Sequence, residues 1–129
     1  MKLRLVVIAL AMLLLALGFN LFTPSSASAQ GMTDDCMHSA SATIDSLEMC
    51  VKHAEEQGHI DSQNVAHALL LKLDKAEDAL VSGHTRTAIG RLKAFIHEVK
   101  DQSGKHIQPM HVKHLVMHAD MVIQAIQKG

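Results

Sequence analysis

The stretch PMHVKHLVMHADMVIQAIQK, residues 109–128, decides how this sequence folds, because its apolar residues recur with the spacing of an α-helix. At about 100° per residue, its side chains fall into three sectors, whereas a helix that only packs and stays soluble needs two. The apolar sector comprises Val112, Leu115, Val116, Ala119, Val122, Ile123 and Ile126. Beside it lies a strip of soft metal ligands: Met110, His111, His114, Met117, His118 and Met121. The remaining sector is polar.

Three more helical segments precede this one, and each ends at a glycine. We expect the first over about 43–57, the second from Asp61 or Ser62 to Val81, and the third from Thr85 to Gly104, with Pro109 in the first turn of the fourth. No segment alternates as a strand does, and the short links force neighbouring helices to run antiparallel. The sequence therefore predicts an all-α protein, an antiparallel up-down four-helix bundle after an N-terminal signal peptide.

The predicted core follows from the helical periodicity. The second helix is expected to be the most buried, because the run Ala68-Leu69-Leu70-Leu71 leaves it little polar perimeter. In the first three helices the core positions are Ile44, Leu47, Val51, Ala54, Val65, Leu69, Leu73, Ala76, Leu80, Ala88, Leu92, Phe95, Ile96 and Val99.

The N-terminus has the pattern of a secretory signal. Lys2 and Arg4 precede an apolar run over residues 5–17, and Ala27-Ser28-Ala29 resembles a cleavage site. We expect a signal peptide at 1–29, a flexible segment at 30–42 and the helical domain at 43–129, with secretion or periplasmic localisation. The alternative is a retained anchor, since the apolar stretch extends to Phe22. No other segment is a candidate for a stable membrane span.

The composition of the mature chain excludes a nucleic-acid function. Removing Lys2 and Arg4 lowers the twelve basic residues to ten, against thirteen acidic ones, which gives a formal net charge of −3. Nucleic-acid binding requires concentrated basic charge and often aromatic stacking platforms, and Phe95 is the one large aromatic residue after position 29. All ten histidines lie in the mature part.

Cys36 and Cys50 would meet an oxidising compartment, where pairing is the usual outcome. On one continuous helix their Cα atoms would lie about 21 Å apart, whereas a disulfide tolerates about 4.4–6.8 Å. A Cys36–Cys50 disulfide therefore requires the chain to reverse before about Thr43. Thiols paired at a metal and exposed thiols remain the alternatives.

Several short motifs resemble a known family. They are Cys50-Val51-x-His53-Ala54, Gly58-His59-Ile60, Lys72-Leu73-Asp74-x-Ala76, Ala94-Phe95-Ile96-His97-Glu98-Val99, Gly104-Lys105-His106-Ile107 and His114-Leu115-Val116-Met117-His118-Ala119. Over about 44–126 the chain resembles the FIMAH domain, a small helical module of bacterial secreted and surface proteins. The resemblance implies an extracellular module of the kind commonly appended to enzymes or adhesins, and it assigns no chemistry to particular positions.

The strip on the last helix is a candidate metal site. His114 and His118 lie one turn apart and His111 three residues earlier, so all three imidazoles can face one ion. Thioethers from Met110, Met117 or Met121 would favour copper, whereas imidazole alone also suits zinc. The competing interpretation is structural, because methionines and histidines beside an apolar face commonly serve packing and hydrogen bonding.

Histidines outside the strip are weaker candidates for metal ligands. His106 could turn toward His111 or cap a backbone group, and capping is favoured. His53 and His59 flank the end of the first helix, where a protonated His53 would suit the helix dipole. We treat His67, His84 and His97 as surface residues.

No catalytic constellation is present. The spacing His114-x-x-x-His118 lacks the glutamate of the zinc-protease motif, and no nucleophile elbow occurs. With so few aromatic residues, the chain also offers a poor haem pocket. The leading hypothesis is a secreted, non-enzymatic module that binds an unidentified extracellular protein or envelope component. The alternative is a protein that buffers or carries copper or zinc, and no cofactor is certain.

Overall fold

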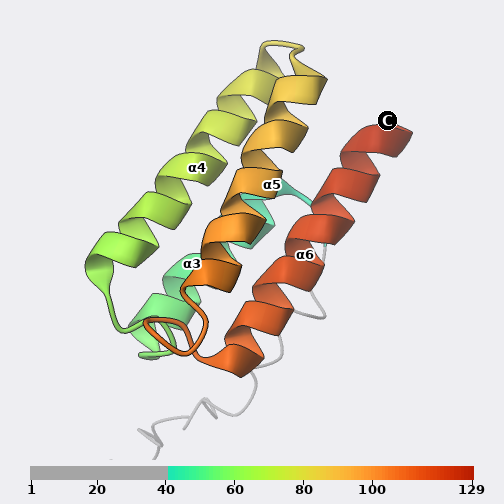
Figure 1. Cartoon of the computed structure of the whole chain (residues 1–129). Helices are drawn as coiled ribbons and strands as arrows, with labels where there is room; N and C mark the ends of the chain where they lie inside the picture. The colour runs from blue at the N-terminus through green and yellow to red at the C-terminus, as the bar shows by residue number, and fades with distance from the viewer. Residues whose placement is uncertain (1–40) are drawn as a thin grey trace, which may run out of the picture. The chain divides into compact units, whose positions relative to one another are not determined.

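The computed structural model describes residues 41–129, which form four α-helices. They are α3 (Ile44–Glu56), α4 (Gln63–Val81), α5 (Thr85–Asp101) and α6 (Pro109–Lys128). Within this range the β-structure is limited to isolated bridges. The helices run alternately up and down (Figure 1), which confirms the predicted all-α bundle. The expected signal peptide, nearly all of the flexible segment, and Cys36 lie outside the described residues.

Local signals set the helix boundaries close to where the sequence placed them. Thr43 caps α3 in a capping box with Ser46, and the Ser62 hydroxyl accepts a hydrogen bond from the Val65 amide at the start of α4. Pro109 occupies the first turn of α6, as expected. Gly58 follows α3 with a φ of +73°, a conformation that costs other residues strain.

Each helix packs on two neighbours, in the order α3, α4, α5, α6 and back to α3. The core that they enclose is built around fully buried side chains such as Leu47, Leu69, Leu92 and Phe95. The run that predicted α4 to be the most buried helix is only partly enclosed, because Leu69 is fully buried whereas Leu71 is 44% exposed. Because α4 occupies a corner of the bundle, its outer side has no helix to cover it. Leu80 and Ile96 are partly buried at the edge of the core.

The α3–α4 and α5–α6 links are joined at one end of the bundle. Ile60 and Ile107 form an antiparallel bridge, and both side chains are buried. The amide of Asp61 donates to the carbonyl of His106, and the amide of Gln108 donates to the carbonyl of His59, each at 3.0 Å. Figure 1 shows the two links together, with the α4–α5 turn at the opposite end. This junction fixes the residues after α3 against the start of α6.

No helix within residues 41–129 combines the length and the apolar character needed to cross a bilayer.

Phe95→Ala tests the core. The ring is fully buried, so its removal should lower the free energy of unfolding by about 3–5 kcal/mol, measured by urea denaturation. Val81→Ala is the matched control, because Val81 is 82% exposed, and it should change stability by no more than about 0.5 kcal/mol. Equal effects of the two substitutions would contradict this core.

Candidate functional site

Six of the ten histidines, His53, His59, His106, His111, His114 and His118, lie on α3, on α6 or in the two joined links. They divide into a buried residue, His118, a partly buried group near the junction, and the exposed His106. These settings differ enough that the predicted strip does not act as one unit.

His118 connects α6 to the first turn of α3. It is 3% exposed, its Nε2 lies 3.0 Å from the Ser46 Oγ, and its Nδ1 lies 3.5 Å from the Cys50 Sγ. The Ser46 hydroxyl has one hydrogen and two carbonyl acceptors, Ser41 at 2.6 Å and Thr43 at 2.8 Å. We therefore assign the ring hydrogen to Nε2 of His118, which donates to Ser46. Burial lowers the pKa of His118, so the neutral form is favoured.

A second group brings imidazoles from three elements together. His111 on α6 stacks on His59 from the α3–α4 link, with ring centroids 3.7 Å apart and planes 18° apart. His114, one turn further along α6, meets His111 edge to face at 5.8 Å. His53, in the last turn of α3, is close enough to His111 to act on it electrostatically. We call His53, His59, His111 and His114 the histidine cluster.

His59 is held in a defined tautomer. Its Nδ1 lies 3.1 Å from Oε1 of Gln108, the N-cap residue of α6, whose side chain makes no capping hydrogen bond. Since an amide oxygen only accepts, Nδ1 of neutral His59 carries the hydrogen. Its Nε2 then has a free lone pair, which is the atom that a metal or a hydrogen-bond donor would use.

His111 has a buried nitrogen without a partner. Within the described part of the chain, its Nδ1 is the one buried side-chain nitrogen or oxygen that makes no hydrogen bond. Burial lowers the pKa of His111, and the neighbouring His59, His114 and His53 lower it further. The neutral form of His111 is therefore favoured near pH 7.

The remaining predicted ligands are dispersed. Met110 is 62% exposed and Met117 40% exposed, whereas Met121 is partly buried. His106 neither turns toward His111 nor caps a backbone group: its Nδ1 lies 2.8 Å from Oδ1 of Asp61. The expectation of capping is therefore wrong, because a carboxylate across the junction is the nearer partner. His67, His84 and His97 are exposed, as expected.

Sequence reasoning gave two important residues too little weight. The sequence does not place His59 and Ser46 beside the strip, because their positions depend on how α3 packs on α6. One sequence signal is shared by the two links: Gly58 and Gly104 are each followed within two residues by a histidine. This similarity indicates that both links place an imidazole at the same end of the bundle.

No three His, Cys, Asp or Glu side chains within residues 41–129 converge on a point suited to a metal ion in the conformation observed. Cys50 is buried beside His118, and its predicted disulfide involves Cys36, outside the described residues.

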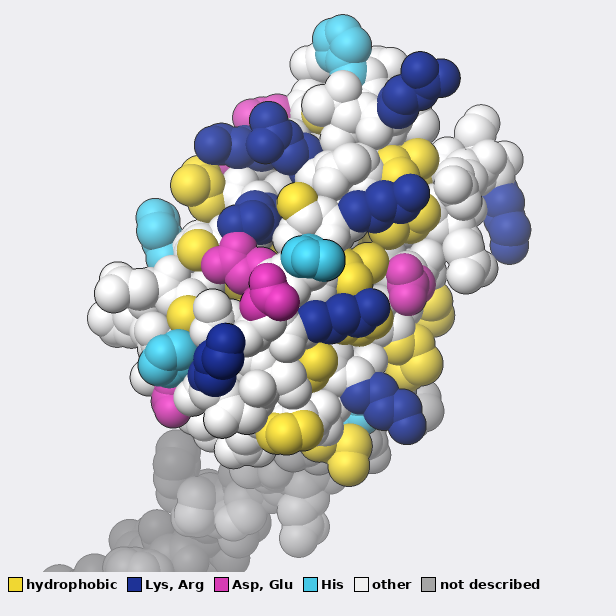
Figure 2. Space-filling model, in the orientation of Figure 1, with side chains coloured by type: hydrophobic (Ala, Val, Ile, Leu, Met, Phe, Trp, Pro, Cys, Tyr) yellow, Lys and Arg dark blue, Asp and Glu magenta, His cyan; other side chains and the backbone are white. Residues whose placement is uncertain are grey.

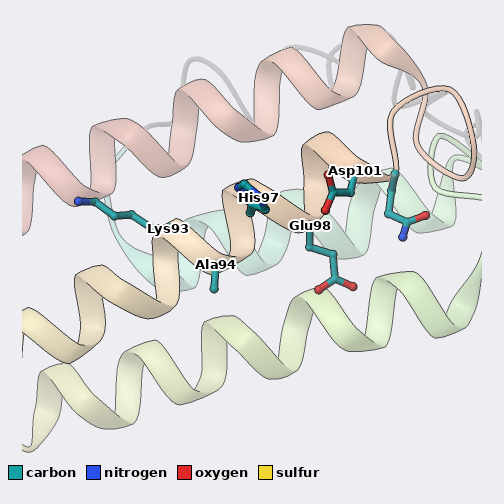
Figure 3. A pocket seen from close by; sticks show the side chains of 6 residues that line it. Lys93, Ala94, His97, Glu98 and Asp101 are labelled. Atoms are coloured by element: carbon teal, nitrogen blue, oxygen red, sulfur yellow. The ribbon is translucent and has the colours of Figure 1, made fainter.

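The described surface has several open hollows and a mixture of charges. Lysine and arginine side chains are spread over the face in Figure 2, with acidic and histidine side chains between them. A shallow hollow is lined by Lys93, Ala94, His97, Glu98, Asp101 and Gln102. Figure 3 shows Lys93, Ala94, His97, Glu98 and Asp101 along α5, and Gln102 is the residue that follows this helix. Glu98 is already paired with Lys72 on α4.

The FIMAH domain model matches residues 44–124, which is more than half of the chain and covers α3, α4, α5 and most of α6. The chain belongs to the FIMAH domain family. Comparison with curated proteins gave no significant match, and neither did comparison with solved structures. The family model thus includes both His118 and the histidine cluster within its matched range.

Acid should destabilise the FIMAH fold. Because the folded-state pKa values of His111 and His118 lie below the ordinary 6.5, the unfolded chain binds more protons as the pH falls below that value. Their contribution to stability is complete above about pH 6.5 and is lost as the pH falls through the folded-state pKa values. The urea midpoint should be lower at about pH 5.5 than at about pH 7.5.

His118→Gln should reduce that difference between the two midpoints, because glutamine does not titrate. His97→Gln removes an exposed histidine and should leave the difference unchanged. Equal reduction by both substitutions would show that burial of His118 is not the cause.

Proposed function

We propose that this chain is a secreted, non-enzymatic helical module that binds an extracellular protein or an envelope component. The observation that carries the proposal is the exposure of three methionines on α3 and α6, two helices that pack against each other. Met49 and Met110 are each 62% exposed and Met117 is 40% exposed. Large apolar side chains left in solvent are a mark of interaction sites when they share a surface.

The packing of α3 on α6 supports a shared surface. Met49 precedes His53 by one turn on α3, while Met110 and Met117 lie one turn before and after His114 on α6. α3 packs on α6, and the proximity of His53 and His114 lowers the pKa of His111. Methionine is flexible and polarisable, which suits a surface that adapts to a partner.

The hollows on the described surface are open rather than enclosed, which suits a binding role. The hollow of Figure 3 is lined by α5 and by Gln102 directly after it, whereas substrate sites are usually concave and bury most of a ligand. The proposal assigns no catalytic residue.

Retention on isolated cell envelopes tests this function. The double substitution Met110→Gln with Met117→Gln should weaken retention at least about tenfold, because burying even one methionine contributes about 1.5–3 kcal/mol. A pull-down at several protein concentrations, with and without EDTA, gives the comparison.

Leu71→Gln is the matched control, since Leu71 is similarly exposed at 44% but lies on α4. It should retain wild-type binding. If the control weakens retention as much as the methionine double variant, or if EDTA abolishes retention, the α3–α6 interaction surface is refuted.

A second candidate function is buffering or carriage of copper or zinc. It is favoured by the unpartnered Nδ1 of His111 among other imidazoles. Its support is narrower than the sequence indicated, because both ring nitrogens of His118 already have neighbours. His111 and His114 remain available, whereas Met110 and Met117 are exposed to solvent.

A further inference from the structure

We propose that the histidine cluster is a binding site for a borderline divalent cation such as Zn²⁺, Ni²⁺ or Cu²⁺, with His59, His111 and His114 as ligands. The site differs from the ligand strip on α6, because it draws His59 from the α3–α4 link and omits His118. The inference rests on the second candidate function, metal binding, and does not depend on the interaction surface.

The two histidines of α6 already have a suitable spacing. Two imidazoles that bind one metal through nitrogens at about 2.0–2.1 Å have ring centroids about 5–6 Å apart. The His111 and His114 centroids are 5.8 Å apart, with their planes inclined by 65°. Because they are three residues apart on one continuous helix, their Cβ atoms remain neighbours when the rings rotate.

His59 supplies the third nitrogen with its hydrogen-bond partner in place. Metal-bound histidines usually donate the other ring N–H to an oxygen, which fixes the tautomer and the direction of the lone pair. The Nδ1 of His59 meets this condition through Oε1 of Gln108 at 3.1 Å, so Nε2 is the ligand atom. The backbone bond from Gln108 to the His59 carbonyl holds the two residues together.

The unpartnered Nδ1 of His111 is the independent sign of a ligand. A buried nitrogen without a hydrogen bond is uncommon, and an ion is one of the partners that resolve it. In the observed conformation the ring of His59 lies flat on that of His111, so the three nitrogens do not converge. A rotation of the partly exposed His59 and His111 rings out of the stack is required, and side-chain rotations of this kind are fast.

The ligand set determines the class of metal. Neutral imidazoles suit zinc, nickel and copper, whereas magnesium and calcium prefer oxygen ligands. Three protein nitrogens leave a fourth position for water or for His53, which lies near His111 on the α3 side.

The test is a titration of the purified chain, without a polyhistidine tag, with ZnCl₂ and then NiCl₂ by calorimetry, together with NMR of the histidine ring nitrogens. We expect one equivalent bound with micromolar affinity or tighter, and perturbed ring signals from His59, His111 and His114. Gln108→Leu removes the hydrogen-bond partner of His59 and should weaken metal binding about tenfold. His59→Ala and His111→Ala each remove a ligand and should weaken binding by more than that.

His67→Ala and His97→Ala are matched controls, because both residues are exposed on other helices, and they should bind as the wild type does. Circular dichroism of each variant confirms folding. Metal binding that persists unchanged in His59→Ala and His111→Ala would overturn this site while leaving metal binding elsewhere in the chain. No binding at millimolar metal would overturn both the site and the second candidate function.

Discussion

The antiparallel bridge between Ile60 and Ile107 is the constraint on which the functional end of the molecule depends. It buries one isoleucine from each link and adds two backbone hydrogen bonds across the links. Without it, His59 would belong to a free turn after α3, and Gln108 would be an ordinary residue before α6. With it, His59 lies against His111 and holds a fixed tautomer. The bridge thus makes neighbours of side chains that are about forty-five residues apart in the sequence. The Asp61–His106 contact crosses the same junction.

The helices could be predicted from the sequence because their signals are local. A capping residue, an apolar periodicity and a left-handed glycine each act within one or two turns, so Thr43, Gly58 and Pro109 mark boundaries without knowledge of the tertiary fold. Exposure at helix edges could not be predicted in the same way. Leu71 is apolar and exposed, whereas His118 is polar and buried. Each outcome depends on which side of its helix the two neighbours cover.

His118 shows why the candidate site was only partly predictable. A helix at the corner of a bundle contacts two neighbours, so it buries a wider arc than its apolar residues span. The strip on α6 lies at the margin of that arc, and α3 covers part of it. Where α3 covers it, an imidazole must satisfy both nitrogens inside the protein, which His118 does with Ser46 and Cys50. Where the cover ends, near the junction, His111 and His114 stay partly open.

This division gives α6 two kinds of histidine that cannot exchange roles. Recruiting His118 to a metal would break its bond to Ser46, whose hydroxyl also binds the Ser41 and Thr43 carbonyls at the start of α3. Recruiting His118 would therefore destabilise the capped start of α3 as well as remove the hydrogen bond of the imidazole. The histidine cluster does not have this cost to a helix cap, because unstacking His59 from His111 leaves the backbone hydrogen bonds of the junction intact. Ligand binding at this end of the molecule would therefore disturb the core less if it used His59 than if it used His118.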